Sequence, residues 1–132
     1  MATDSTRSDG LQALTMTTNW PRPNVCLVRL RGELDIATAP LLADYLREHT
    51  AGAPAYLLLD LAAVKFLAAA GITLIVTALR SQQGIRGQVH LIGVTDNPSV
   101  RRVLDLTRLR PECAEHDSVD TALDHIDEAG RM

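Results

Sequence analysis

The stretch Leu57-Leu58-Leu59-Asp60-Leu61-Ala62-Ala63-Val64-Lys65-Phe66-Leu67-Ala68-Ala69-Ala70-Gly71-Ile72 decides the fold of this chain. It begins as an apolar run of the length of a buried strand, and a helical pattern opens near its end. A strand that is apolar throughout is typical of a parallel sheet covered by helices. The segment therefore predicts a strand over Ala55–Leu61, a short loop, and a helix over Ala69–Gln83.

The rest of the chain also alternates strand and helix patterns. Further strands are predicted over Leu11–Thr17, Val25–Leu30, Gln88–Val94 and Glu112–His116. Further helices are predicted from an N-cap at Thr38 to near Gly52, over Pro98–Leu106, and after a cap at Asp117 or Ser118. Two prolines predict a turn over Asn19–Asn24, because proline donates no ladder hydrogen bond. This alternation predicts an α/β fold.

Length and composition limit the class of protein. The polar residues 1–10 are predicted to be a disordered lead-in, and residues 11–130 a single domain. No apolar run is long enough to span a bilayer and the first residues lack an apolar signal core. We therefore expect a cytoplasmic protein without membrane insertion. The net charge of −3 gives no reason to expect nucleic acid as a partner.

Cysteines and histidines show no spacing typical of metal ligands or redox motifs. Cys26 lies in a buried-strand pattern and Cys113 near the last predicted strand, so both are interpreted as packed thiols. The four histidines fall in separate predicted elements. No metal site and no cofactor are expected.

Three segments resemble the STAS domain, which occurs in anti-sigma-factor antagonists and in the tails of sulfate transporters. Asp60, Leu61, Val64, Phe66 and Gly71 match the family's pattern Asp-Leu-x-x-Val-x-Phe-x-Asp-Ser-Ser-Gly. The run from 31 to 39, Arg-Gly-Glu-Leu-Asp-Ile-Ala-Thr-Ala, is similar to the family's Gly-Glu-Leu-Asp-x-x-Thr-Ala element, and residues 97–104 are similar to its segment before the third helix. The resemblance spans roughly residues 11–127. It implies a single STAS-like domain with a mixed, mainly parallel sheet and four or so helices.

The chain departs from the family at its phosphorylation site. In the family the first serine of the Asp-Ser-Ser triplet is phosphorylated by a partner kinase. Ala68, Ala69 and Ala70 stand at those positions and carry no hydroxyl. No phosphorylation is therefore expected there, and Thr73 is kept as a minor candidate for a displaced phosphosite.

The resemblance implies a regulatory binding module rather than an enzyme. The leading hypothesis is a bacterial anti-sigma factor antagonist, acting for example in a stress response. It would bind an anti-sigma factor of the histidine-kinase-like ATPase type and free a sigma factor for transcription. The alternative is a cytoplasmic STAS accessory subunit of a membrane transport complex. An enzyme is disfavoured, because no His, Asp and Ser or Cys grouping falls near one predicted loop. A weak homodimer is left open.

The partner is expected to bind where two loops leave the sheet. Loops that follow parallel strands emerge at the same edge, where open α/β sheets place their sites. The residues expected to bind the partner are Asp35, Thr38, Phe66, Ala68, Ala69, Ala70 and Gly71. For Asp35, partner contact and support of the loop are weighed equally.

Overall fold

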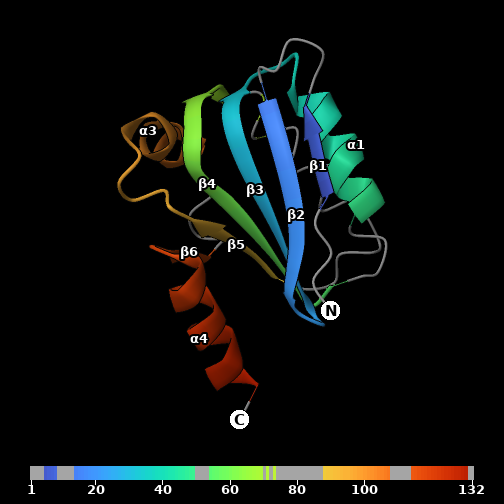
Figure 1. Cartoon of the computed structure of the whole chain (residues 1–132). Coiled ribbons are helices and arrows are strands. Elements are labelled where there is room, and N and C mark those ends of the chain that lie inside the picture. The colour runs from blue at the N-terminus through green and yellow to red at the C-terminus, as the bar shows by residue number, and fades with distance from the viewer. Residues whose placement is uncertain are drawn as a thin grey trace.

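The computed structural model describes residues 5–8, 14–49, 54–69, 71, 73, 88–107 and 114–130 (Figure 1). The strands in these ranges are β1 (Ser5–Ser8), β2 (Leu14–Arg22), β3 (Val25–Leu34), β4 (Tyr56–Leu67), β5 (Gln88–Ile92) and β6 (Ala114–His116). The helices are α1 (Ala39–His49), α3 (Pro98–Thr107) and α4 (Val119–Ala129). The helix predicted over Ala69–Gln83 lies largely outside the described residues, although Ala69, Gly71 and Thr73 are helical.

The strands form one sheet in the order β1-β2-β3-β4-β5-β6. β2 is antiparallel to both of its neighbours, whereas the pairs β3-β4, β4-β5 and β5-β6 are parallel. The prediction of an α/β domain with a mixed, mainly parallel sheet is confirmed. The described part of the chain has three helices, where four or so were expected in the whole.

Helices cover both faces of the sheet. In β3, Cys26 and Val28 lie in the cluster of buried residues that also contains the apolar residues of α1 and α3. Val25 and Leu27, which alternate with them, lie in a second cluster with the apolar residues of α4. Because both faces are covered here, β3 starts with four buried residues in a row instead of an alternating pattern.

β4 is longer than predicted because it contains two irregularities in its pairing with β3. Arg29 pairs with Asp60 but Arg31 pairs with Ala63, and Gly32 pairs with Val64 but Glu33 with Phe66. Each shift places one extra residue in β4, as a β-bulge does. The predicted end at Leu61 is therefore wrong, and the strand continues to Leu67.

Asn97 binds the backbone of β4 beside the first irregularity. Its side-chain Nδ2 donates hydrogen bonds to the carbonyl oxygens of Leu61 (3.0 Å) and Val64 (2.8 Å). Buried backbone groups that lose their ladder partner need another one. Asn97, which precedes α3, thus supports the bulged part of β4 that leads to the site described below.

The N-terminal part of the sheet differs from the prediction. Ser5–Ser8, within the segment predicted to be disordered, pairs with β2 as strand β1. The turn predicted over Asn19–Asn24 is wrong in its extent, because β2 runs to Arg22 and only Pro23 and Asn24 form the turn. The register shifts between Asn19 and Arg22, so the intervening Pro21 sits where the regular ladder is interrupted.

Candidate functional site

The loop between β3 and α1 is organised by Asp35 and Thr38. The Asp35 carboxylate accepts hydrogen bonds from the backbone N–H groups of Ala37 (2.9 Å) and Thr38 (3.0 Å). These backbone hydrogen bonds, first that of Thr38, hold the pKa of Asp35 below its usual value. The geometry therefore gives Asp35 the supporting role, and its half-buried side chain leaves part of it accessible.

Thr38 occupies the predicted N-cap position of α1, since its carbonyl oxygen accepts the N–H of Leu42 at 3.1 Å. Its buried hydroxyl, however, turns back to the loop. The hydroxyl donates to the Glu33 carbonyl (3.0 Å) and accepts from the Asp35 N–H (2.9 Å). Thr38 thus joins the end of β3 to the start of α1 and is not itself exposed to a partner.

The turn after β4 lies directly against this loop. The N–H of Ala68 donates to the carbonyl oxygen of Leu34 (2.9 Å), and the N–H of Gly71 donates to that of Ala68 (3.0 Å). A Cβ added at Gly71 would lie 3.3 Å from the Asp35 carbonyl oxygen. The absence of a side chain at Gly71 therefore allows the two loops to approach each other.

Apolar side chains are exposed at this edge of the sheet. Ile36 in the first loop is 71% exposed, and Phe66 near the end of β4 is 50% exposed. Ala69, at the start of the helical segment, is exposed as well. We call this the loop-edge surface and define it by Asp35, Ile36, Phe66, Ala68 and Ala69. Single exposed apolar residues are common, but several at one edge indicate a contact surface.

The structure brings together most of the residues predicted for the site. Asp35, Ala68 and Gly71 are in contact through their backbones, and Phe66 lies opposite Glu33 in the strand pairing. Ala70 lies outside the described residues, and Thr73 is exposed. Ile36 is not among the residues predicted for the site, although it stands inside the Asp-Ile-Ala-Thr element and an isoleucine in a predicted loop is a signal of such a site.

A groove of about 480 Å³ with both polar and apolar lining residues lies beside the loop-edge surface. The residues lining it are Arg31, Ala62, Ala63, Val64, Lys65, Asp96 and Asn97. Its two cationic side chains, Arg31 and Lys65, are exposed on β3 and β4. The groove beside the loop-edge surface thus carries two cationic side chains and one acidic side chain, Asp96.

Three further predictions concern the cysteine thiols, a metal site and a membrane-spanning segment. Cys26 is fully buried, and burial raises the pKa of its thiol to about 12, so the thiol stays protonated and unreactive. Cys113 lies outside the described residues. Within the described ranges, no group of three or more His, Cys, Asp or Glu side chains is arranged to hold a metal ion. None of the helices described there is long and apolar enough to cross a membrane.

Comparison with protein families identifies the class of this chain. A sequence model of the STAS domain family matches residues 21–129, which is most of the chain. The chain therefore belongs to the STAS domain family. A comparison with curated proteins finds no match.

Solved structures with the same fold include anti-sigma factor antagonists. An anti-sigma factor antagonist from Mycobacterium paratuberculosis is 26% identical with a TM-score of 0.73, over 92% of this chain and 99% of that one. The anti-sigma factor antagonist SpoIIAA in its unphosphorylated form is 19% identical with a TM-score of 0.70, over 86% and 96% of the two chains. STAS domains of such antagonists are binding domains without enzymatic activity.

A structure of a different kind shares the fold. SLC26A9 is 14% identical with a TM-score of 0.64, and the match covers 80% of this chain but 20% of that one. At this identity the likeness concerns the fold alone. The STAS fold therefore occurs both in small separate proteins and as a part of a much longer chain.

Proposed function

We propose that this protein is an anti-sigma factor antagonist that binds a kinase-type anti-sigma factor and so frees a sigma factor for transcription. The observation that carries the proposal is the loop-edge surface, which exposes apolar side chains at the carboxyl ends of β3 and β4. Similarity over nearly the full length of the antagonist from Mycobacterium paratuberculosis supports it. The partner expected is an anti-sigma factor of the histidine-kinase-like ATPase type.

The chemistry of this surface favours binding that phosphorylation does not control. Positions 68–70 carry only methyl groups, so no phosphate can be attached there. A phosphate would bring roughly −1.5 to −2 charges to the start of the helical segment. The exposed Ala69 adds no charge at that position, so binding would be controlled by the supply of protein or partner.

The proposal is tested by measuring affinity for each anti-sigma factor of this type from the same genome. The decisive variant is Ala69→Glu, which places a negative charge where the family carries phosphate. An unpaired charge buried in an interface costs several kcal/mol, so binding should weaken by about 100-fold. The carboxylate suits the start of a helix, so the circular dichroism should not change.

A matched control is available at the other end of the same strand. Ala55 is exposed and precedes β4, whereas Ala69 follows it, and the strand between them is about 40 Å long. Ala55→Glu adds the same charge and should leave affinity unchanged. If Ala69→Glu binds as tightly as the wild type, the loop-edge surface is not the interface and the proposal fails.

A second pair of variants tests whether binding depends on where an exposed apolar side chain lies or only on its hydrophobicity. Ile36 in the first loop and Leu106 in α3 are both 71% exposed. Ile36→Ala should weaken binding by about tenfold, as for a partly buried interface residue, while Leu106→Ala should have no effect. Equal losses in the two variants would argue against a defined site.

The alternative role is that of a cytoplasmic accessory subunit of a membrane transport complex. Its support is the fold shared with SLC26A9, which is weaker because that identity is low. Pulldown from a bacterial lysate distinguishes the two roles. Retention of a histidine-kinase-like ATPase supports the antagonist, whereas retention of a permease subunit supports the alternative. Sedimentation of the purified protein tests whether the weak homodimer that the sequence leaves open is formed.

A further inference from the structure

Three histidines that are far apart in the sequence meet on the face of the sheet covered by α4. His90 in β5 is fully buried, and its Nδ1 lies 2.8 Å from Nε2 of His116 in β6. The two rings are stacked with centroids 5.0 Å apart. The ring of His125 in α4 lies 5.4 Å from that of His116 and 6.2 Å from that of His90. We call these residues the histidine cluster.

The bond between His90 and His116 depends on protonation. A neutral imidazole has one N–H donor and one acceptor nitrogen, so one ring can donate to the other. When both rings are charged, both facing nitrogens carry hydrogens and neither can accept. The bond is then lost, and two cations oppose each other with a third imidazole nearby.

His49 provides a contrast within the same protein. Its Nδ1 lies 2.8 Å from the carbonyl oxygen of Tyr45, and its ring stacks on the Tyr45 ring. A carbonyl oxygen accepts a hydrogen bond from a neutral or a charged imidazole alike. The contact of His49 therefore survives protonation of its ring, whereas that between His90 and His116 is lost once both rings are charged.

Among the described residues, the neighbours of the cluster include an aromatic ring and an acidic side chain. From β4, Tyr56 meets His90 edge to face with ring centroids 5.7 Å apart. The acidic neighbour in sequence is Asp117, which acts to raise the pKa of His116, while burial and His125 lower it further than Asp117 raises it. Burial, followed by His116 and His125, lowers the pKa of His90 to about 4.

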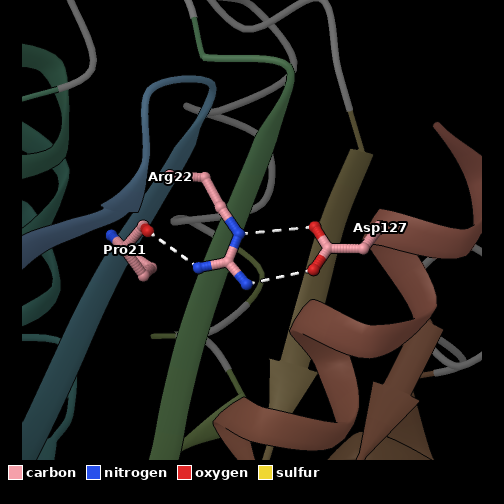
Figure 2. A network of polar contacts seen from close by, with 3 residues as sticks. All are labelled: Pro21, Arg22 and Asp127. Carbon is pink, nitrogen blue, oxygen red and sulfur yellow. Dashed lines mark hydrogen bonds and ion pairs between the residues drawn. The ribbon is translucent and has the colours of Figure 1, made fainter.

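Other charged groups near these elements are partly engaged elsewhere. Glu115, next to His116 in β6, forms an ion pair with Arg101 of α3 (2.7 Å). In α4, Asp127 pairs with Arg22 at the end of β2 (Figure 2). The remaining acidic residues of α4 are the exposed Asp120, Asp124 and Glu128. None of these four groups of α4 acts on the pKa of His90 or His116.

We propose that the histidine cluster makes the attachment of β6 and α4 to the sheet dependent on pH. These elements are packed at neutral pH and loosen under mild acidification, while the opposite face of the sheet stays packed. α4 is the element concerned because it carries His125 and covers the face on which the cluster lies. The cluster of buried residues under α1 and α3 contains no histidine among the described residues.

The sign of the effect follows from proton binding. In the folded state the pKa of His90 lies below the ordinary value of 6.5, so the loosened state binds protons more readily. The stabilisation is complete above about pH 6.5 and is lost as the pH falls toward about 4. The ion pair between Arg22 and Asp127 persists over most of this range, because carboxylates ordinarily titrate near pH 4.

The test is amide hydrogen exchange at about pH 7.5 and about pH 5.5, corrected for the intrinsic exchange rate, with EDTA present to remove metal ions. One group that releases its proton on packing changes the opening equilibrium of residues 114–130 by about tenfold over this interval. We therefore expect the amide protection of α4 to fall by about tenfold at the lower pH, with no comparable fall in α1.

Three variants connect this effect to the cluster. His116→Gln keeps a polar nitrogen near the position of Nε2 without titrating, and His125→Gln removes the third ring; each should reduce the pH effect in α4. His49→Asn removes a histidine whose bond tolerates charge, and should leave the effect at its wild-type size. His116 and His125 are partly or well exposed, so these variants should fold even if changes at the buried His90 do not.

Either of two results overturns the proposal. In one, α4 loses no more protection than α1 on acidification. In the other, the His116→Gln and His125→Gln proteins show the same pH effect as the wild type and as His49→Asn. Binding of an anti-sigma factor does not enter the test, so it stands apart from the proposed function.

Discussion

Two loops meet at the carboxyl ends of β3 and β4, and they hold their shapes by different means. In the loop after β3, side-chain oxygens of Asp35 and Thr38 bind backbone groups. In the turn after β4, Ala68 and Ala69 have no side-chain oxygen, and backbone hydrogen bonds and the close approach at Gly71 fix the conformation. One loop is thus shaped by its own side chains, and the other by packing against the first.

Gly71→Val should give the largest effect, because it removes the close packing on which the turn depends. A side chain there would press on the Asp35 carbonyl oxygen, which a Cβ alone would already meet at 3.3 Å. Overpacking of this kind costs up to about 3 kcal/mol. Urea unfolding measures the loss, and Gly71→Ala should cost less. A Gly71→Val protein as stable as the wild type would contradict the dependence of one loop on the other.

Thr38→Ala should have the next largest effect, acting on the loop shaped by side chains. The variant leaves the part-buried Glu33 carbonyl and the Asp35 N–H without their hydroxyl partner. We expect a loss of about 1–2 kcal/mol in the free energy of unfolding. Thr38→Ser keeps the hydroxyl and should retain most of the stability. Equal losses for serine and alanine would assign the effect to packing of the methyl group instead.

Asp35→Asn should give a smaller effect that depends on pH. Hydrogen bonds to the carboxylate lower the pKa of Asp35 in the folded state. Its contribution is therefore present above the ordinary value of 3.8 and is lost as the pH falls through the lower folded value. The urea midpoints of wild type and Asp35→Asn should differ at neutral pH and converge in acid. A constant difference would show that the charge of Asp35 does not matter.

Ala68→Asp should produce the smallest effect, and in the opposite direction. The variant gives the turn after β4 the kind of side-chain acceptor that the other loop already has. A capping carboxylate at the start of a helix stabilises it by about 0.5–1 kcal/mol. Ala68→Asn tests capping without charge. If neither variant gains stability, the backbone N–H groups in the first turn of that helix already have hydrogen-bond partners.

The sequence predicted the positions of these loops but not their internal structure. Parallel strands at β3 and β4 follow from the apolar runs and the intervening helix, so both loops had to emerge at one edge. The direction of the Thr38 hydroxyl could not be predicted. A cap toward α1 was expected from local preference, whereas the hydroxyl binds back to Glu33 because β3 ends beside it.

Two errors come from features that do not appear in local patterns. The prediction ends β4 at Leu61 because the residues that follow the apolar run are interpreted as a short loop, whereas the strand continues through two bulges in its pairing with β3. The histidines were treated as separate because their approach depends on sheet register. His90 and His116 belong to adjacent parallel strands, and α4 then returns over them to bring in His125.

Each of the two bulges of β4 changes which face of the sheet the following side chains occupy. In β4, the residues that belong to the buried cluster under α1 and α3 fall on odd numbers up to Leu61, move to Val64 after the first extra residue, and return to odd numbers at Leu67 after the second. Each extra residue is surplus to the pairing with β3, because Gly32 still pairs with Val64 after the first bulge and Leu34 with Leu67 after the second. Deleting one residue at a bulge would therefore remove that bulge and leave the turn opposite the end of β3. Deleting a residue elsewhere in the strand would shift the register by one and move the side chains beyond it to the other face. Changes in length within this strand should therefore be tolerated only at its two bulges.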